Sequence, residues 1–147
     1  MNRKTILLMS GPNVNLFGQR DESVYGAVTI DELIADATST AEKYDLELEY
    51  FHSNSEGELV TAIQQANDRF AAIIINPGAL THYAWSLHDA LSVFKGIIVE
   101  VHLSNINARE PWRHTSVVAP VANGSIIGFG RLGYVMAVEA VERMLNQ

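Results

Sequence analysis

The chain has 147 residues, 48% of them hydrophobic and 18% charged, which is typical of one globular domain rather than a disordered or fibrous chain. The absence of cysteine excludes disulfides and thiolate metal sites, and the net charge of −7 with only 10 Lys and Arg residues argues against a general nucleic-acid-binding surface. No run approaches the roughly 20 apolar residues of a membrane span, and no signal peptide is evident, so we expect a cytoplasmic protein with a single domain over residues 1–147.

Apolar runs of strand length alternate with segments of helical periodicity along the chain. The predicted strands are residues 5–9, 46–51, 71–75, 97–101 and a shorter run at 116–119. The apolar faces of the predicted helices span residues 30–44, 59–70, 87–94 and 135–145. Capping-box sequences at Thr29 and Ser55 precede the first two helices. Strands this rich in Ile, Leu and Val indicate a parallel sheet buried on both faces, so we predict a doubly wound, flavodoxin-like α/β fold with strand order 2-1-3-4-5.

The connection after the first predicted strand, residues 10–26, is far longer than the roughly 2 to 6 residues that a βα connection needs. It carries Asn13, Arg20 and Tyr25, whose side chains are of types that bind ligands or transfer protons. In a doubly wound sheet, ligands bind beyond the ends of the first and third strands. We therefore expect this loop and residues 76–82 to line the ligand site, the alternative for the loop being a compact Ω-loop packed on its own apolar side chains.

A phenol needs an adjacent cation to act as a base near neutral pH, because phenols ordinarily ionise with a pKa of about 10. A guanidinium about 4 Å away would favour a phenolate by about 4 kcal/mol, before the cost of desolvation, at an effective dielectric constant of about 20. Arg20 lies five residues from Tyr25 in the same loop and is the first candidate for this cation.

Glu100 and His102 are two residues apart at the end of the fourth predicted strand, so their side chains lie on the same side of it. A carboxylate beside an imidazole fixes its tautomer and favours its protonated form, which suits a general acid; the alternative is a buried histidine held by a local ion pair. Arg109 and Arg113 would form a small positive mouth for a carboxylate or for hydroxyls, unless Glu110 merely neutralises them.

His82 and Asp89 are seven residues apart, which would place them on one helix face but about 10 Å apart along its axis. Asp89 is therefore poorly placed for the pocket of its own chain, and is either a surface charge or a residue that meets the site of a neighbouring subunit. Residues 128–133 match the pattern G-x-G-x-x-G, but we expect only one helix after them and interpret them as a loop packed tightly against that helix.

Four segments carry distinctive motifs: GPNVNLFGQR at residues 11–20, YG at 25–26, NPGALTH at 76–82 and EVHLSNINARE at 100–110. In this order, and over nearly the whole chain, they resemble the type II 3-dehydroquinate dehydratases. The resemblance implies a flavodoxin-like fold and a dodecamer built as a tetramer of trimers. It also implies the reversible anti elimination of water from 3-dehydroquinate to give 3-dehydroshikimate, through an enolate, in the shikimate pathway and without a metal or an organic cofactor.

The resemblance further implies a role for each matching residue. Tyr25 would remove a C2 proton with Arg20 stabilising the charged states, and His102 would protonate the departing C1 hydroxyl. Asn13 would hold a water against the enolate, and Glu100 would orient the imidazole. The substrate-binding positions would be Asn76, His82, Leu103, Ser104, Arg113 and, from the adjacent subunit, Asp89. The lid over the substrate would consist of Arg20, Asp21, Glu22, Ser23, Val24 and Tyr25.

The chain departs from the family pattern at Asn107, where a histidine is common, and at Pro111-Trp112, which alters the spacer before Arg113. One alternative is a flavodoxin-like module that binds flavin or a nucleotide, although Pro12 and the bulky residues after it stand where a phosphate cradle would need small amide donors.

A further alternative is a metal hydrolase. It would use a set of four candidate ligands, namely His82, Asp89, Glu100 and His102.

Overall fold

Five parallel strands form the centre of the computed structural model, which describes residues 2–147. The strands are β1 (Thr5–Ser10), β2 (Glu47–His52), β3 (Ala72–Asn76), β4 (Ile97–His102) and β5 (Gly124–Ile127). Their order in the sheet is β2-β1-β3-β4-β5, and every pairing is parallel, which confirms the predicted 2-1-3-4-5 topology. The first four strands each end one residue later than expected, and that last residue is polar in all of them.

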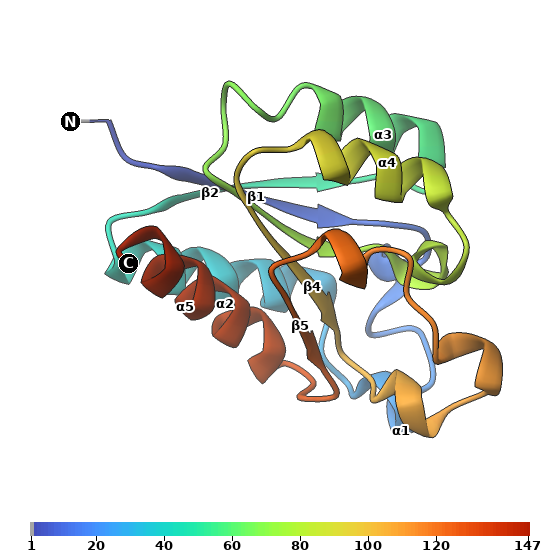
Figure 1. Cartoon of the computed structure of the whole chain (residues 1–147). Helices are drawn as coiled ribbons and strands as arrows, with labels where there is room; N and C mark the ends of the chain where they lie inside the picture. The colour runs from blue at the N-terminus through green and yellow to red at the C-terminus, as the bar shows by residue number, and fades with distance from the viewer. Residues whose placement is uncertain (1) are drawn as a thin grey trace.

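Helices cover both faces of this sheet (Figure 1). They are α1 (Glu22–Tyr25), α2 (Ile30–Lys43), α3 (Glu56–Gln64), α4 (Trp85–Val93) and α5 (Leu132–Leu145). The pair α2 and α5 packs on one face and the pair α3 and α4 on the other. The N-cap half of each predicted capping box forms, because the Thr29 and Ser55 hydroxyls accept hydrogen bonds from the backbone N–H groups of Glu32 and Glu58. Over residues 2–147, no helix combines the length and apolar character needed to cross a membrane.

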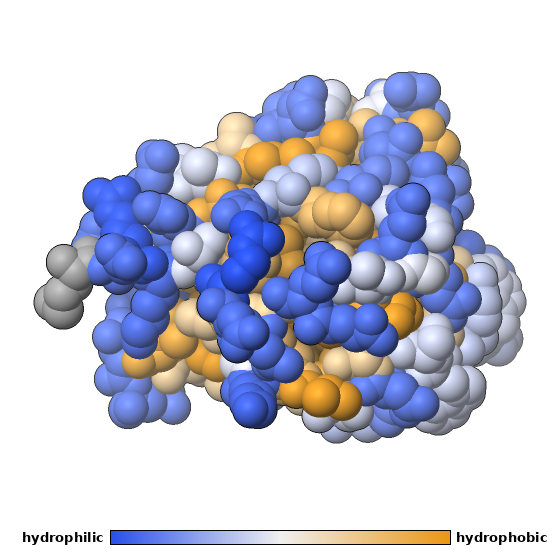
Figure 2. All heavy atoms as spheres, turned by 90° about the horizontal axis from the view of Figure 1, so that it is seen from above, coloured by the Kyte–Doolittle hydropathy of each residue, from blue (hydrophilic) through white to orange (hydrophobic). Residues whose placement is uncertain are grey.

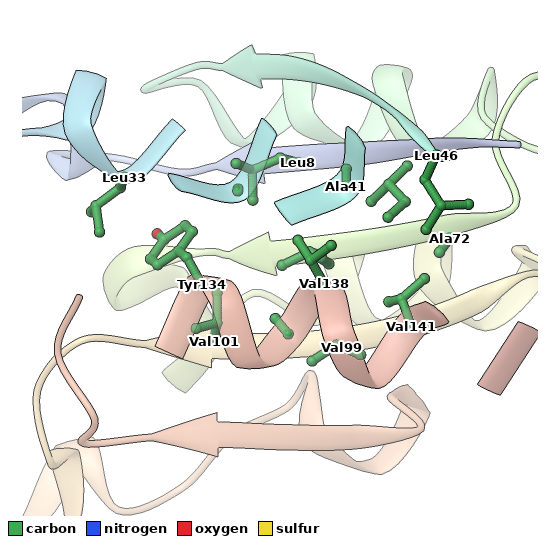
Figure 3. Close-up of a cluster of buried hydrophobic side chains, with 14 of the residues drawn as sticks. Leu8, Leu33, Ala41, Leu46, Ala72, Val99, Val101, Tyr134, Val138 and Val141 are labelled. Atoms are coloured by element: carbon green, nitrogen blue, oxygen red, sulfur yellow. The ribbon is translucent and has the colours of Figure 1, made fainter. Parts of the chain in front are cut away.

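The two hydrophobic clusters of the core lie on opposite faces of the sheet. The first joins the sheet to α2 and α5, and Figure 3 shows Val138 and Val141 of α5 among the side chains of this cluster. The second cluster joins the other face to α3 and α4. Side chains such as Leu8 are fully buried, and each such burial contributes roughly 1.5–3 kcal/mol, so the sheet is a firm base for the loops at its carboxyl edge.

The fifth strand lies at β5 and not at residues 116–119, so the sequence-based prediction was wrong there. Three features of the earlier segment oppose a strand. Pro120 follows it and has no N–H to donate, a 3₁₀ turn occupies Ala119–Val121, and the Ser116 hydroxyl is bonded to a buried carboxylate. The predicted helix over 59–70 also ends early, at Gln64, and Phe70 is buried from the loop that follows.

Candidate active site

A cavity of about 180 Å³ opens at the carboxyl ends of β1, β3 and β4. Ten residues singled out in the sequence line it: Asn13, Arg20, Tyr25, Asn76, His82, His102, Leu103, Ser104, Arg109 and Arg113. Among the described residues, the lining contains three arginines and two histidines but no aspartate or glutamate. Such a lining favours an anionic ligand.

Two glycines allow the loops after β1 and β3 to touch through their backbones. A Cβ on Gly11 would lie 2.4 Å from the Pro77 carbonyl oxygen, and one on Gly78 would lie 2.7 Å from the Pro12 carbonyl oxygen. Gly78 also has a φ of +61°, which side-chain-bearing residues adopt with strain. This close crossing brings the first loop over the end of β3, so both predicted segments line one site.

Arg20 and Tyr25 form a direct pair on the first loop. The Arg20 Nη2 donates a hydrogen bond to the Tyr25 hydroxyl oxygen over 2.6 Å, and the Arg20 Cζ lies 4.0 Å from the centroid of the phenol ring. The local fold sets this up, because the Asp21 carboxylate caps α1 by accepting hydrogen bonds from the backbone N–H and the hydroxyl of Ser23. The Arg109 Cζ lies 5.2 Å from the centroid of the same ring, so two guanidinium groups lie against the phenol.

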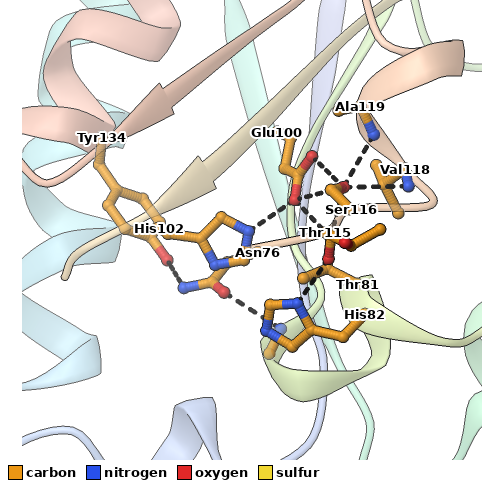
Figure 4. Close-up of polar contacts among 11 residues, drawn as sticks. Asn76, Thr81, His82, Glu100, His102, Thr115, Ser116, Val118, Ala119 and Tyr134 are labelled. Atoms are coloured by element: carbon orange, nitrogen blue, oxygen red, sulfur yellow. Dashed lines mark hydrogen bonds and ion pairs between the residues drawn. The ribbon is translucent and has the colours of Figure 1, made fainter. Parts of the chain in front are cut away.

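His102 and Glu100 form a second pair, on the end of β4 (Figure 4). The His102 Nε2 lies 2.6 Å from the Glu100 Oε2, and both residues are buried. Burial raises the pKa of the Glu100 carboxyl, but hydrogen bonds from His102, Thr81 and Ser116 and the charge of the imidazole outweigh burial and lower it. Glu100 is therefore a carboxylate, and the Nε2–H of His102 donates to it. No described residue bonds the His102 Nδ1, which leaves that nitrogen to the cavity.

The two hydroxyls that hold Glu100 were not predicted from the sequence. Thr81 donates to the Glu100 Oε2, and the Ser116 Oγ lies 2.8 Å from the Oε1. Thr81 lies in the segment 76–82, from which only Asn76 and His82 were singled out, and Ser116 was assigned to a strand. A chemical argument could have found them, since a buried carboxylate requires hydrogen-bond donors and nearby hydroxyls are candidates.

His82 lines the cavity with its tautomer fixed. Its Nδ1 lies 2.7 Å from the carbonyl oxygen of Thr115, so the Nδ1–H donates there and the Nε2 is left as an acceptor. Burial, reinforced by the positive charges of His102 and Arg113, lowers the pKa of His82 despite the opposing effects of the Thr115 carbonyl and Glu100. A neutral imidazole that accepts a hydrogen bond suits a ligand hydroxyl.

Arg109 and Arg113 form the predicted positive group at the cavity entrance, and Glu110 pairs with Arg113 there. The Arg113 Nε donates to the Glu110 Oε2 over 2.9 Å, while the Arg109 Nη1 donates to the Ser104 Oγ over 3.2 Å. The Trp112 ring lies 4.0 Å from the Arg113 Cζ and holds the guanidinium from the solvent side. Each arginine therefore keeps free N–H donors at the cavity.

Asp89 does not line this cavity. His82 ends a 3₁₀ turn at Gly78–His82, whereas Asp89 belongs to α4, so the expectation that both share one helix was wrong. The chain turns at Tyr83, and Asp89 lies instead at a groove of about 490 Å³ between α3 and α4. Figure 2 shows the face that carries these helices, where hydrophobic residues gather between hydrophilic ones.

The metal and flavin alternatives fit this geometry poorly. Asp89 lies apart from the other three residues of the proposed metal set, and among residues 2–147 no three His, Asp or Glu side chains are grouped to hold a metal ion. The first loop turns Pro12, Val14 and Phe17 toward the cavity, where a phosphate group would need glycine or hydroxyl-bearing residues with free N–H donors.

A doubly wound sheet that carries a phenol–guanidinium pair and an imidazole–carboxylate pair around one cationic cavity defines a small α/β enzyme of the acid–base type. The sequence identifies the family more closely. The chain belongs to the dehydroquinase class II family, whose sequence model matches residues 4–142.

Individual relatives agree with this assignment. A 3-dehydroquinate dehydratase from Caldicellulosiruptor bescii is 42% identical over 144 residues, which cover 97% of this chain and 99% of the relative. One from Bacillus subtilis is 46% identical over 132 residues, which cover 90% of this chain and 89% of the relative. The crystal structure of a type II dehydroquinase from Butyrivibrio crossotus superposes with a TM-score of 0.92 at 39% identity, covering 99% of both chains.

Proposed function

We propose that this chain is a single-domain catalyst for the reversible dehydration of 3-dehydroquinate to 3-dehydroshikimate, a step of the shikimate pathway. The observation that carries the proposal is the arrangement of two activated pairs, Arg20–Tyr25 and Glu100–His102, around one cavity. The substrate is a carboxylate with several hydroxyls, and the cavity supplies cations and hydrogen-bonding side chains without a carboxylate of its own.

In the first step, the Tyr25 phenolate takes a proton from C2, next to the substrate ketone, and the electron pair of the C–H bond moves into an enolate. Arg20 makes this possible because its N–H already lies 2.6 Å from the phenolic oxygen. At about 4 Å and an effective dielectric constant of about 20, a guanidinium favours the phenolate by about 4 kcal/mol before desolvation is counted. Asn13 holds a water molecule against the enolate oxygen.

In the second step, the enolate collapses to form the C1–C2 double bond while the C1–O bond breaks. His102 donates a proton to the departing oxygen, so that water leaves rather than hydroxide. Glu100 keeps the imidazole oriented and favours its protonated form through the hydrogen bond at Nε2, which leaves Nδ1 as the donor. The proton held by Tyr25 returns through solvent, and no redox partner is needed.

The remaining cavity residues hold the substrate. The backbone of Leu103 and Ser104 receives the substrate carboxylate, while Asn76, the neutral His82 and Arg113 bind hydroxyls. Side chains from the segments that follow β3 and β4 thereby orient the ring so that C2 faces the phenol.

Residues 20–25 act as a lid that excludes water once the substrate is bound. The chain assembles as a dodecamer, a tetramer of trimers, in which Asp89 reaches the cavity of the adjacent subunit. The position of Asp89 on the α3–α4 face, away from its own cavity, supports this role. We also place the enzyme in the cytoplasm, which agrees with a chain without cysteine.

The experiment is to mix the protein, with a strong chelator present, with 3-dehydroquinate and to follow the ultraviolet absorbance of the conjugated product. Tyr25→Phe and His102→Ala should each lower kcat by about 100-fold or more, while calorimetry still detects substrate binding. Tyr44→Phe, which alters an exposed phenol after α2, is the matched control and should be unchanged. Near-normal turnover by Tyr25→Phe would show that the base is wrongly assigned.

A further inference from the structure

We propose that Tyr134 is a positioning residue, whose phenol fixes the Asn76 amide in the orientation that recognises a substrate hydroxyl. The inference rests on the proposed function only for the identity of the substrate. Tyr134 belongs to α5 and does not line the cavity, so it acts through the amide and not by touching the reacting atoms.

The contact between the two side chains is direct and buried. Asn76 ends β3, and its Nδ2 donates a hydrogen bond to the Tyr134 hydroxyl oxygen over 3.1 Å. Tyr134 is 0% exposed and Asn76 is 3% exposed, so water does not compete for this bond. Figure 4 shows the phenol and the amide meeting behind the His102 ring, on the side of the amide that faces the helix.

The network determines which way the amide points. The backbone N–H of Gly78, which can only donate, lies 3.2 Å from the Asn76 Oδ1. The oxygen must therefore face Gly78, and the nitrogen must face Tyr134. Since the phenol oxygen accepts there, its own proton points elsewhere. The Ser10 hydroxyl, which is buried and aligned with Asn76 across the β1–β3 pairing, has no hydrogen-bond partner among the described residues.

Tyr134 serves as a neutral hydrogen-bonding group and not as a second base. Complete burial raises the pKa of its phenol, an effect that the nearby hydroxyl and amide oppose only in part. With one N–H given to the phenol and one lone pair given to Gly78, the Asn76 amide keeps one donor and one acceptor for the cavity. That combination matches a hydroxyl, which both donates and accepts.

A purely structural role predicts different behaviour, because Tyr134 also packs in the first core cluster beside Leu33 and Val101. Tyr134→Phe keeps the ring and deletes only the hydroxyl. Tyr50→Phe is the matched control, since Tyr50 packs against the same cluster but its hydroxyl has no hydrogen-bond partner in the described chain.

The test is a double-mutant cycle on kcat/KM for 3-dehydroquinate with Tyr134→Phe and Asn76→Ala. We expect Tyr134→Phe to lower kcat/KM about 10-fold, chiefly through KM, in the otherwise unaltered enzyme. In the Asn76→Ala background the same change should cost less than about 2-fold, because the amide that it positions is gone. Tyr50→Phe should remain within about 2-fold. Equal losses from Tyr134→Phe in both backgrounds would overturn the proposal.

A second measurement needs neither activity nor a stable variant. In the unaltered chain, the side-chain amide protons of Asn76 should include one that exchanges with solvent at least about 10-fold more slowly than those of the exposed Asn2, as followed by nuclear magnetic resonance. If both protons exchange as fast as those of Asn2, the positioning role is wrong. If the slow proton is present but the enzyme does not dehydrate 3-dehydroquinate, the proposed function fails and the network stands.

Discussion

Glu100→Gln removes the negative charge behind the proposed acid while preserving the shape of the side chain. The His102 Nε2 and the Glu100 Oε2 are 2.6 Å apart. At that distance an ion pair gains about 6 kcal/mol at an effective dielectric constant of about 20, which is a gross figure before desolvation. A hydrogen bond to a charged group retains a net value of about 1.5–3 kcal/mol, so we expect kcat to fall by about 10- to 150-fold.

The division of the loss between kcat and KM carries the more specific expectation. Glu100 does not line the cavity, so the loss should fall on kcat, with KM within about 2-fold of that of the unaltered enzyme. The assay follows product absorbance over a range of substrate concentrations. The one carbonyl oxygen of the variant, at the position of Oε2, can still accept from Thr81 and Ser116, and the folding of the variant is checked by circular dichroism.

Glu49→Gln is the control, because Glu49 pairs with Arg69 on the exposed edge of the sheet, over 2.8 Å, and lies away from the cavity. Its kcat and KM should match those of the unaltered enzyme. A folded Glu100→Gln protein with unchanged kcat would refute the reasoning, since the carboxylate would then contribute nothing to the acid.

Three further outcomes follow from contacts at the site. Arg20→Met deletes the donor 2.6 Å from the Tyr25 hydroxyl and should lower kcat about 10- to 150-fold, and kinetics showing a rise in KM alone would contradict this. Because the pKa of His82 is lowered in the folded state, the unfolded state binds more protons than the folded state as the pH falls below 6.5, and the free energy of unfolding should decrease there. Urea titrations should show a smaller decrease for His82→Gln. Gly11→Ala would place a Cβ 2.4 Å from the Pro77 oxygen and should cost about 1–3 kcal/mol, visible as a lower Tm, whereas an unchanged Tm would show that the loops separate freely.

Sequence periodicity predicted the sheet well because the strands are buried on both faces and therefore read as continuous apolar runs. The same signal ended each of the first four strands one residue early. Hydrophobicity stops at the last apolar residue, whereas the backbone pairing continues through Ser10, His52, Asn76 and His102. The polar residues that complete these strands lie at the edge of the sheet where the cavity opens. The errors in the predicted strand ends therefore lie close to the candidate site.

Long-range contacts could not be predicted in the same way. Tyr134 stands just before the apolar face predicted for residues 135–145, and only the packing of α5 against the end of β3 brings its hydroxyl to Asn76. Ser116 likewise reads as part of a short apolar run, although its hydroxyl serves a carboxylate on β4. By contrast, the pairs Arg20–Tyr25 and Glu100–His102 are local in sequence, which is why spacing alone could suggest them.

The base and its cation are carried by one short stretch of chain, whereas the acid and its carboxylate are built into the end of a buried strand. The two pairs therefore lie on separate segments of the chain, one on a loop and one on the sheet. The base and the acid face the same substrate only when the loop segment that carries Tyr25 is correctly placed over the cavity. A small molecule that wedges beneath that stretch would disable catalysis while leaving both pairs intact, which offers a route to inhibitors that need not resemble the transition state.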